Sequence, residues 1–95
     1  IGKMLSVEGA REELLRTMLN GMREMPGCLS YIIARDPVDP NALWITEVWE
    51  SREEHQASLQ LQTVQETIGK ARPLIAGFGE RFETEPVGGF GIQSR

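Results

Sequence analysis

The sequence has one cysteine, one histidine, few aromatic side chains and no long apolar run. A single cysteine cannot form an internal disulfide, and a free thiol is typical of a reducing compartment, so we expect a cytoplasmic protein. Cys28 and His55 are too few for a zinc site, which needs three or four ligands, so we expect no metal. The apolar runs are only a few residues long and cannot cross a bilayer, so we expect no membrane partner.

An excess of positive charge is also lacking. The formal net charge is −4, and the ten basic residues are scattered along the chain. Binding to a phosphate backbone needs the opposite balance, so we expect no nucleic-acid partner. The N-terminus has no signal-peptide pattern, and because Ile1 lies within an apolar pattern, we expect a few residues to precede it. Residues 1–95 are predicted to form one domain, since this length leaves too little chain for a second core.

Hydrophobic periodicity predicts an alternation of strands and helices. The helical stripe is clearest between residues 10 and 25, and the clearest strand is 42–50. The expected elements are a strand at 1–7, a helix at 10–25, strands at 28–35 and 42–50, helices at 52–59 and 62–76, a final strand at 78–85 and an extended tail at 86–95.

Local signals mark the ends of these elements. Pro26 and Gly27 are expected to end the first helix, and the proline-rich segment 36–41 is expected to form a hairpin loop. Ser51, followed three residues later by Glu54, is a capping box at a helix start. Pro73 is expected to tighten or kink the last helix and Gly77 to end it.

The element order strand–helix–strand–strand–helix–strand predicts a ferredoxin-like α+β fold with a four-stranded antiparallel sheet. Helices would cover one face of this sheet. The strand at 42–50 is apolar on both faces, with Ile45 and Trp49 on one side and Trp44 and Val48 on the other. The second face must also be covered, and a second copy of the chain is the simplest cover, so we expect a homodimer.

Several segments resemble the antibiotic biosynthesis monooxygenase family. They are Met-Pro-Gly-Cys-Leu-Ser-Tyr at 25–31, Ile-Thr-Glu-Val-Trp-Glu-Ser at 45–51, Arg-Pro-Leu-Ile-Ala-Gly-Phe at 72–78 and the Pro-Val-Gly-Gly tail at 86–89. The most specific part is Glu-x-Trp-Glu-Ser followed by a helix that carries His55. The resemblance implies a dimeric α+β barrel with a hydrophobic pocket between the sheet and the helices of each subunit.

The resemblance also implies an activity. Known members oxidise polycyclic phenols, anthrones or quinols with O2 and without flavin, haem or metal, so we expect no cofactor. Other members degrade haem with an Asn on the first strand and a Trp and a His on the second helical segment. The matching positions here hold Gly2, Ser58 and Ile68, which leaves no ligand for haem iron. We therefore set the haem-degrading branch aside.

Cofactor-free oxygenation requires a base that ionises a flat aromatic substrate. His55, the only histidine, and Glu47, a carboxylate in mid-strand, are the candidate catalytic residues. Both have structural alternatives. His55 could be a solvated side chain beside Glu53 and Glu54. For Glu47 we favour an ion pair with a basic side chain of another strand, namely Lys3, Arg35 or Arg81.

Flat and adaptable apolar side chains are the candidate substrate-binding residues, and they are Trp49, Tyr31, Met22 and Phe78. Aromatic residues on strands more often pack in a core or a dimer interface than in a ligand pocket. The methionine stripe of the first helix is likewise first a core feature. Between Trp44 and Trp49, we favour Trp49 for the pocket because His55 follows it closely.

Three hypotheses for function remain open. The first is a cofactor-independent monooxygenase (an oxidoreductase) acting on a quinol or related aromatic. The second is an isomerase or another small-molecule-modifying enzyme on the same fold, whose reaction would proceed under nitrogen. The third is a non-catalytic dimer that binds an apolar metabolite and is stabilised by it. The substrate expected under the first hypothesis is small, aromatic and quinone-like.

Overall fold

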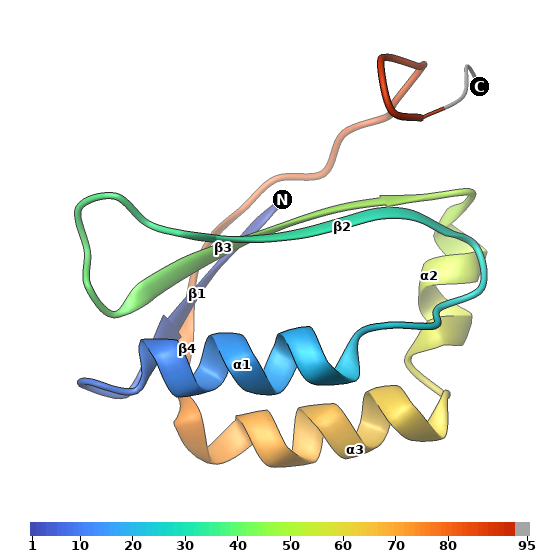
Figure 1. The fold of residues 1–95 in the computed structure, drawn as a ribbon. Coiled ribbons are helices and arrows are strands. Elements are labelled where there is room, and N and C mark those ends of the chain that lie inside the picture. Colours follow the sequence, from blue (N-terminus) through green and yellow to red (C-terminus); the bar gives the residue numbers. More distant parts are fainter. Residues whose placement is uncertain (93–95) are drawn as a thin grey trace.

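The computed structural model describes residues 1–92. The strands and helices follow each other in nearly the predicted order (Figure 1). They are β1 (Gly2–Ser6), α1 (Arg11–Gly21), β2 (Cys28–Arg35), β3 (Ala42–Trp49), α2 (Arg52–Ser58), α3 (Gln62–Ala71), the 3-10 turn η1 (Arg72–Leu74) and β4 (Ile75–Arg81). Within residues 1–92, no helix has the length and apolarity that crossing a bilayer requires.

The four strands form one antiparallel sheet in the order β2-β3-β1-β4. The two β-α-β halves therefore interlock, with β1 and β3 at the centre and β2 and β4 at the edges. Ile45 of β3 lies between Gly2 of β1 and Ile33 of β2. This arrangement confirms the ferredoxin-like α+β fold with a four-stranded antiparallel sheet.

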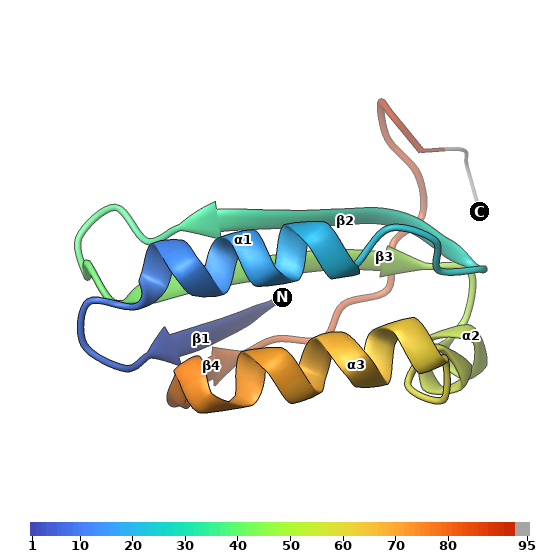
Figure 2. The same ribbon diagram turned by 60° about the horizontal axis from the view of Figure 1, so that its bottom comes forward.

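Helices α1 and α3 lie side by side under one face of the sheet (Figures 1 and 2). The core fills the layer between them and the strands, and Leu14 of α1 and Leu43 of β3 are fully buried. The other members of this cluster are Leu15, Met18, Ile45 and Ala71. Helix α2 stands at the end of the sheet where β3 finishes (Figure 1). The long helices therefore cover the middle of the sheet, and its β3 end adjoins α2.

Helix α1 ends at Gly21, whereas the sequence pattern predicted a helix as far as residue 25. Met22 leaves the helical conformation with φ −94° and ψ 69°. Gly21 lies against α3, where an added Cβ would come within 1.8 Å of the Thr67 Oγ1 atom. The glycine thus allows close packing of the two helices, and the chain turns away directly after this contact.

The prediction for the segment after α3 was wrong at Gly77. The α-helix ends at Ala71, the proline segment forms η1, and β4 already begins at Ile75. Pro73 accounts for the early end because its ring is incompatible with a continuing helix. Ile75 then adopts extended backbone angles, as its β-branched side chain favours. The last strand is therefore Ile75–Arg81 instead of 78–85.

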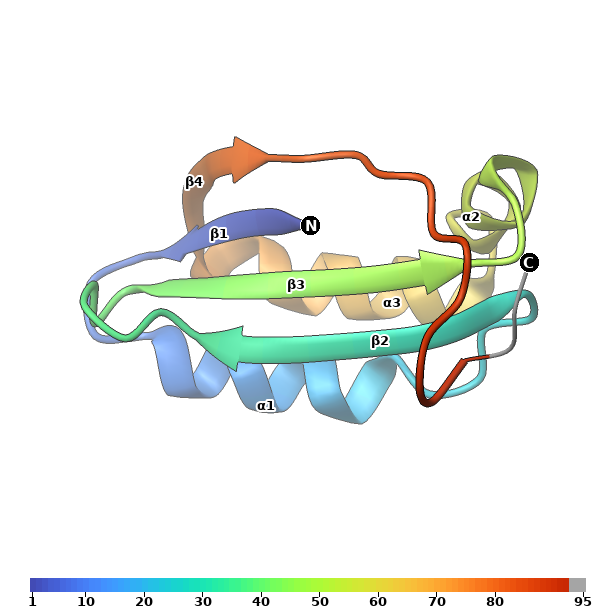
Figure 3. The ribbon, with the colours of Figure 1, turned by 90° about the horizontal axis from the view of Figure 1, so that it is seen from above.

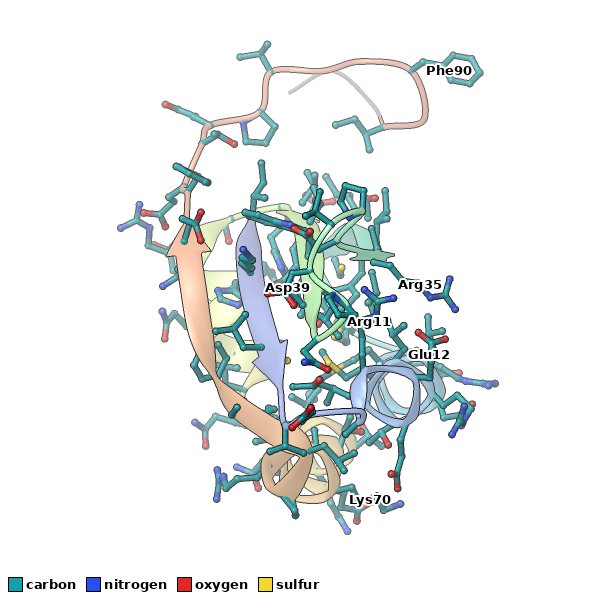
Figure 4. All side chains as sticks on the ribbon, turned by 90° about the vertical axis from the view of Figure 1, so that its left-hand side faces the viewer. Arg11, Glu12, Arg35, Asp39, Lys70 and Phe90 are labelled. Atoms are coloured by element: carbon teal, nitrogen blue, oxygen red, sulfur yellow. The ribbon has the colours of Figure 1, made fainter. Side chains whose placement is uncertain are left out.

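The hairpin loop between β2 and β3 is held by hydrogen bonds to its backbone. The guanidinium Nη1 of Arg11 donates to the carbonyl oxygens of Asp36, Asp39 and Ala42. The carboxylate of Asp36 accepts from the backbone N–H of Asp39, from the indole of Trp44 and from a further loop N–H, and these bonds lower the pKa of Asp36 to about 2. Arg11 and Asp39 lie close together at this end of the molecule (Figure 4). The β2–β3 register is therefore anchored at its loop end.

On the other face of the sheet, no helix of residues 1–92 covers the strands (Figure 3). Ile32 is 56% exposed there, and it shares this face with Trp44 and Val48. After β4 the chain runs across this open side as a tail, and Phe90 stands fully exposed and away from the body (Figure 4). As far as residue 92, the tail has no regular element besides an isolated bridge between Gly89 and Ile92. Of the predicted tail 86–95, residues 93–95 lie outside the described residues.

Candidate functional site

An open groove lies where β1, β3 and β4 approach α2 and the start of the tail. Its volume is about 1220 Å³, which exceeds the roughly 300–1,000 Å³ of a typical ligand pocket because one side is open. Apolar side chains from all three strands line it, among them Met4, Ile45, Trp49 and Phe78. The apolar space is thus at the end of the sheet, beyond the filled core under its middle.

Glu47 and Trp49 bring a polar contact into this groove. They are two residues apart on β3, so their side chains project from the same face of the strand. This is the face of Leu43 and Ile45, which is covered by the helices. The indole Nε1–H of Trp49 donates to Glu47 Oε1 at 3.0 Å. Glu47 therefore has a neutral donor beside it, and the carboxylate is not left unpaired in a half-buried place.

His55 reaches the same oxygen from α2. Its Nε2 atom lies 3.8 Å from Glu47 Oε1, which is within ion-pair range but too long for a hydrogen bond. Its ring packs against Trp49 with 5.2 Å between the ring centroids and 50° between the planes. The side chains of His55 and Glu47 are 28% and 30% exposed, so both are shielded yet open to a small ligand. Trp49, Glu47 and His55 form the candidate site.

The local sequence explains why His55 arrives at this position. Ser51 is the N-cap of α2, and its Oγ accepts from the backbone N–H of Glu54 as the capping box predicted. Because the cap lies two residues after the end of β3 and α2 begins at the next residue, His55 lies one turn into the helix and beside Trp49. Ser58 then donates to the carbonyl oxygen of His55. The turn that carries the histidine is therefore fixed at both ends.

Among residues 1–92, no ion pair joins Glu47 to Lys3, Arg35 or Arg81, the basic side chains that the sequence suggested. Lys3 lies 3.9 Å from Glu80, and Arg35 pairs with Glu12. The strand register gives the reason, since Lys3 is opposite Trp44 on the other face of the sheet and Arg35 is opposite Leu43 at the far end of β3. The favoured structural explanation for Glu47 is therefore replaced by the contacts with Trp49 and His55.

The predicted substrate-binding residues divide into two groups. Trp49 and Phe78 line the groove, and Phe78 is 71% exposed there. Tyr31 and Met22 pack against the hydrophobic core and do not line the groove. Tyr31 lies opposite Glu47 in the β2–β3 pairing. Burial, with the nearby charge of Glu47, raises the pKa of Tyr31, so its hydroxyl keeps its proton at neutral pH.

Cys28 lies opposite Trp49 and is partly buried. Burial raises the pKa of its thiol, so little thiolate is present at neutral pH and the residue is a poor nucleophile. Among residues 1–92, no group of three His, Cys, Asp or Glu side chains is arranged to hold a metal ion.

The groove also has walls that the sequence patterns did not indicate. Residues 83–87 of the tail border it, and Glu83 lies 3.5 Å from Arg52 of α2. Arg81, opposite Gly2 in the sheet, lines the same edge. No local signal marks these residues, because their neighbours come from distant parts of the chain. In the tail, the sequence signal is the Pro-Val-Gly-Gly segment at 86–89, which contains Val87 and resembles the family.

The arrangement places two proton acceptors beside a flat apolar wall. Because the 3.8 Å separation leaves His55 Nε2 without a hydrogen bond to Glu47, a hydroxyl about 2.8 Å from Nε2 can donate to it. Such a group could donate its proton to the imidazole while Glu47 stabilises the imidazolium that forms. The geometry is therefore suited to removing a proton from the hydroxyl of a flat, mostly apolar molecule.

Comparison with known proteins shows similarity across almost the whole chain. The family model described as antibiotic biosynthesis monooxygenase matches residues 8–70. A crystal structure from Chloroflexus aurantiacus J-10-fl, provisionally described as an antibiotic biosynthesis monooxygenase, is 55% identical. The similarity covers 96% of this chain and 93% of that one, with a TM-score of 0.92.

More distant structures share the fold alone. One from Deinococcus radiodurans is 22% identical, covers 93% of this chain and 95% of that chain, and has a TM-score of 0.69. One from Bordetella bronchiseptica is 16% identical, with 90% and 92% covered and a TM-score of 0.75. Both carry the same provisional description as the first. No curated protein matches this chain.

Proposed function

Because this chain belongs to the antibiotic biosynthesis monooxygenase family, we propose that it is a cofactor-independent monooxygenase that oxidises a quinol or a related electron-rich aromatic with O2. The observation that carries the proposal is the pair His55 and Glu47 beside the indole of Trp49 at an apolar groove. The family supplies the reaction class, and the pair supplies the proton transfer that this reaction needs.

In the proposed reaction, His55 Nε2 takes the proton of a substrate hydroxyl. The resulting anion is electron-rich enough to transfer an electron to O2, which the neutral quinol does poorly. A carbon–oxygen bond then forms at the ring, the oxygen–oxygen bond breaks, and one oxygen leaves as water. A quinol and O2 thus give a hydroxyquinone and water, and all four electrons that O2 accepts come from the substrate.

Glu47 has a different part in this proposal. Once His55 is protonated, the carboxylate 3.8 Å away stabilises the imidazolium and so lowers the barrier to proton removal. Trp49 and Phe78 offer flat apolar surface for the substrate rings. The groove is suited to a planar, mostly apolar molecule that presents one hydroxyl to the pair.

The test of this function is O2 uptake by metal-stripped protein with a panel of reduced naphthoquinones and anthrones. We expect turnover, and a fall in kcat of roughly 100-fold or more when His55→Gln removes the base. Glu47→Gln is expected to lower kcat as well, because it removes the charge that stabilises the imidazolium. Glu53→Gln is the control, since Glu53 is an exposed residue of the same helix that does not line the groove.

Two results would contradict the proposal. One is the absence of O2 uptake across the whole panel, and the other is a His55→Gln variant that is as fast as the unchanged protein. A reaction that proceeds equally well under nitrogen would instead assign the pair to a proton-transfer isomerase. Saturable binding without turnover would identify a binder of an apolar metabolite.

We also propose that the working form is a homodimer in which the open sheet faces of two copies pack together. The support is the exposed Ile32 beside Trp44 and Val48 on a face without helices among residues 1–92, together with the largely exposed apolar tail residues Val87 and Phe90. A second copy would cover these side chains and restrict access to the open side of the groove.

A further inference from the structure

Both tryptophans of β3 donate their indole N–H to a carboxylate. Trp44 Nε1 donates to Asp36 Oδ2 at 2.8 Å, and Trp49 Nε1 donates to Glu47 Oε1 at 3.0 Å. The first pair closes the hairpin loop at one end of the strand, on the open side of the sheet. The second pair lies at the other end, in the groove. The strand thus carries one tryptophan–carboxylate pair with a structural role and a similar pair in the candidate site.

The indole of Trp49 is an unusual neighbour for a carboxylate that takes part in proton transfer. An indole nitrogen only donates, so Trp49 can hold Glu47 without competing for a proton. The hydrogen bond engages Oε1, the same oxygen that faces His55 Nε2. Rotation of the Glu47 carboxylate away from His55 would break this hydrogen bond. The indole therefore restrains the orientation of the carboxylate toward the imidazole.

Trp49 also contacts the imidazole itself. Its ring lies against His55 at 5.2 Å between centroids, so one side chain touches both members of the pair. The distance between His55 Nε2 and Glu47 Oε1 is 3.8 Å, which is too long for a direct hydrogen bond. His55 Nε2 consequently stays free for a ligand hydroxyl. A shorter separation would join the two side chains to each other and close the gap.

Strand β2 is irregular where it pairs with the Trp49 end of β3. Cys28 pairs with Trp49 and Ser30 with Val48, so β2 has one extra residue there. A bulge of this kind bends the strand, increases its twist and redirects side chains, and bulges are common beside active sites. The irregularity distinguishes the Trp49 end of β3 from the regular pairing at its Trp44 end.

We propose that Trp49 is a positioning residue, which holds Glu47 Oε1 through its indole N–H and contacts the His55 ring with its own ring, so that His55 Nε2 meets a substrate hydroxyl at a fixed distance from the carboxylate. Its catalytic consequence rests on the proposed function, whereas the positioning of His55 does not. This role differs from that of a flat wall for the substrate, which would need only the aromatic surface of Trp49.

The first experiment measures the His55 ring without using turnover. His55 is the only histidine, so the rate of its modification by diethyl pyrocarbonate reports on this side chain alone. Four variants are compared with the unchanged protein. They are Trp49→Phe, which keeps an aromatic ring but loses the N–H, Glu47→Ala, which removes the acceptor, the double variant, and Trp44→Phe as the matched control.

We expect Trp49→Phe and Glu47→Ala each to change the rate constant by a similar factor, roughly fivefold, as loss of one hydrogen bond to a charged group suggests. The double variant should show no further change, because the indole acts through the carboxylate. Trp44→Phe should match the unchanged protein. An unaltered rate in Trp49→Phe, or two effects that multiply in the double variant, would overturn the proposal and leave Trp49 with packing alone.

A second measurement does not need a folded Trp49 variant. Hydrogen exchange of the two indole N–H groups is followed by NMR in Glu47→Ala and in Asp36→Ala. We expect faster exchange at Trp49 only in Glu47→Ala, together with displaced His55 ring signals, and faster exchange at Trp44 only in Asp36→Ala. Unchanged exchange at Trp49 in Glu47→Ala, or unmoved His55 signals, would overturn the proposal.

Turnover separates positioning from substrate contact. With a quinol that the protein oxidises, Trp49→Phe should lower kcat by roughly tenfold and leave KM within about twofold. A raised KM with unchanged kcat would identify a substrate wall instead. If no quinol is oxidised, the proposed function fails while the two spectroscopic tests still decide the positioning role. If O2 uptake depends on His55 but the modification rates do not depend on Trp49, the function stands and the positioning proposal fails.

Discussion

At the residue scale, Glu12 of α1 and Arg35 at the end of β2 form an exposed ion pair (Figure 4). The hydrogen bonds and charge of Arg35 lower the pKa of Glu12 from 4.5 to about 2. The folded protein therefore keeps this carboxylate charged at a pH where the unfolded chain protonates it. The resulting stabilisation is complete above a pH of about 4.5 and is lost as the pH falls through about 2.

The direction of this pH dependence leads to a prediction for Arg35→Gln. The urea midpoint of the variant should lie below that of the unchanged protein near neutral pH, because the ion pair is lost. The difference should shrink as the pH falls below about 4.5 and vanish near about 2. Arg16→Gln, which changes an exposed arginine on the same helix as Glu12, is the control and should show no such pH dependence. A constant difference at every pH would contradict the assignment.

The residue-scale prediction for Glu47 was correct in one respect and wrong in another. A carboxylate in mid-strand between apolar residues needs a partner, and the structure supplies partners for it. The sequence cannot identify them, because pairing between strands depends on register. Lys3 lies on the opposite face of the sheet from Glu47, and Arg35 lies four positions along the β2–β3 ladder from the pair that contains Glu47.

At the scale of elements, Gly21 shows how tertiary contact can outweigh helix propensity. Alanine in place of a helical glycine usually stabilises by about 0.5–1 kcal/mol. At position 21 the added Cβ would meet the buried side chain of Thr67, which is itself hydrogen-bonded to the Thr63 carbonyl. We therefore expect Gly21→Ala to lower the free energy of unfolding by about 1–3 kcal/mol, as overpacking does.

The control for this prediction lies on the facing helix. An added Cβ at Gly69 of α3 meets nothing within 4 Å, so Gly69→Ala should raise the free energy of unfolding by about 0.5–1 kcal/mol. Urea denaturation measures both variants, and Thr67→Ala should relieve part of the Gly21→Ala penalty. A stabilised Gly21→Ala protein would show that α1 and α3 do not pack as closely as described.

Local sequence sets some element boundaries clearly and leaves others open. Residues 28–35 were predicted as a strand and β2 has those bounds, because a local run of strand formers lies between Gly27 and a proline-rich loop. The start of β4 was missed by three residues. The pattern around Ile75 fits a helix or a strand equally well, and only the turn at Pro73 decides between them.

At the scale of the whole molecule, the proposed homodimer predicts a sedimentation mass twice that of the 10.6 kDa chain. Ile32→Lys should yield monomers, because it places a charge on the face that the second copy would cover. Val38→Lys is the matched control, since Val38 is 88% exposed in the hairpin loop. A monomeric unchanged protein, or an Ile32→Lys variant that remains dimeric, would contradict packing through this face.

The sequence by itself determined the order of the elements, the ferredoxin-like fold and the presence of Glu47 and Trp49 on one face of a strand. These follow from periodicity, turn residues and a helix cap, which act between residues close together in the chain. Only the tertiary structure decided that α2 brings His55 to Glu47, that Tyr31 and Met22 belong to the core, and that the tail borders the groove. Those contacts depend on how distant segments pack together, and no local pattern specifies that packing.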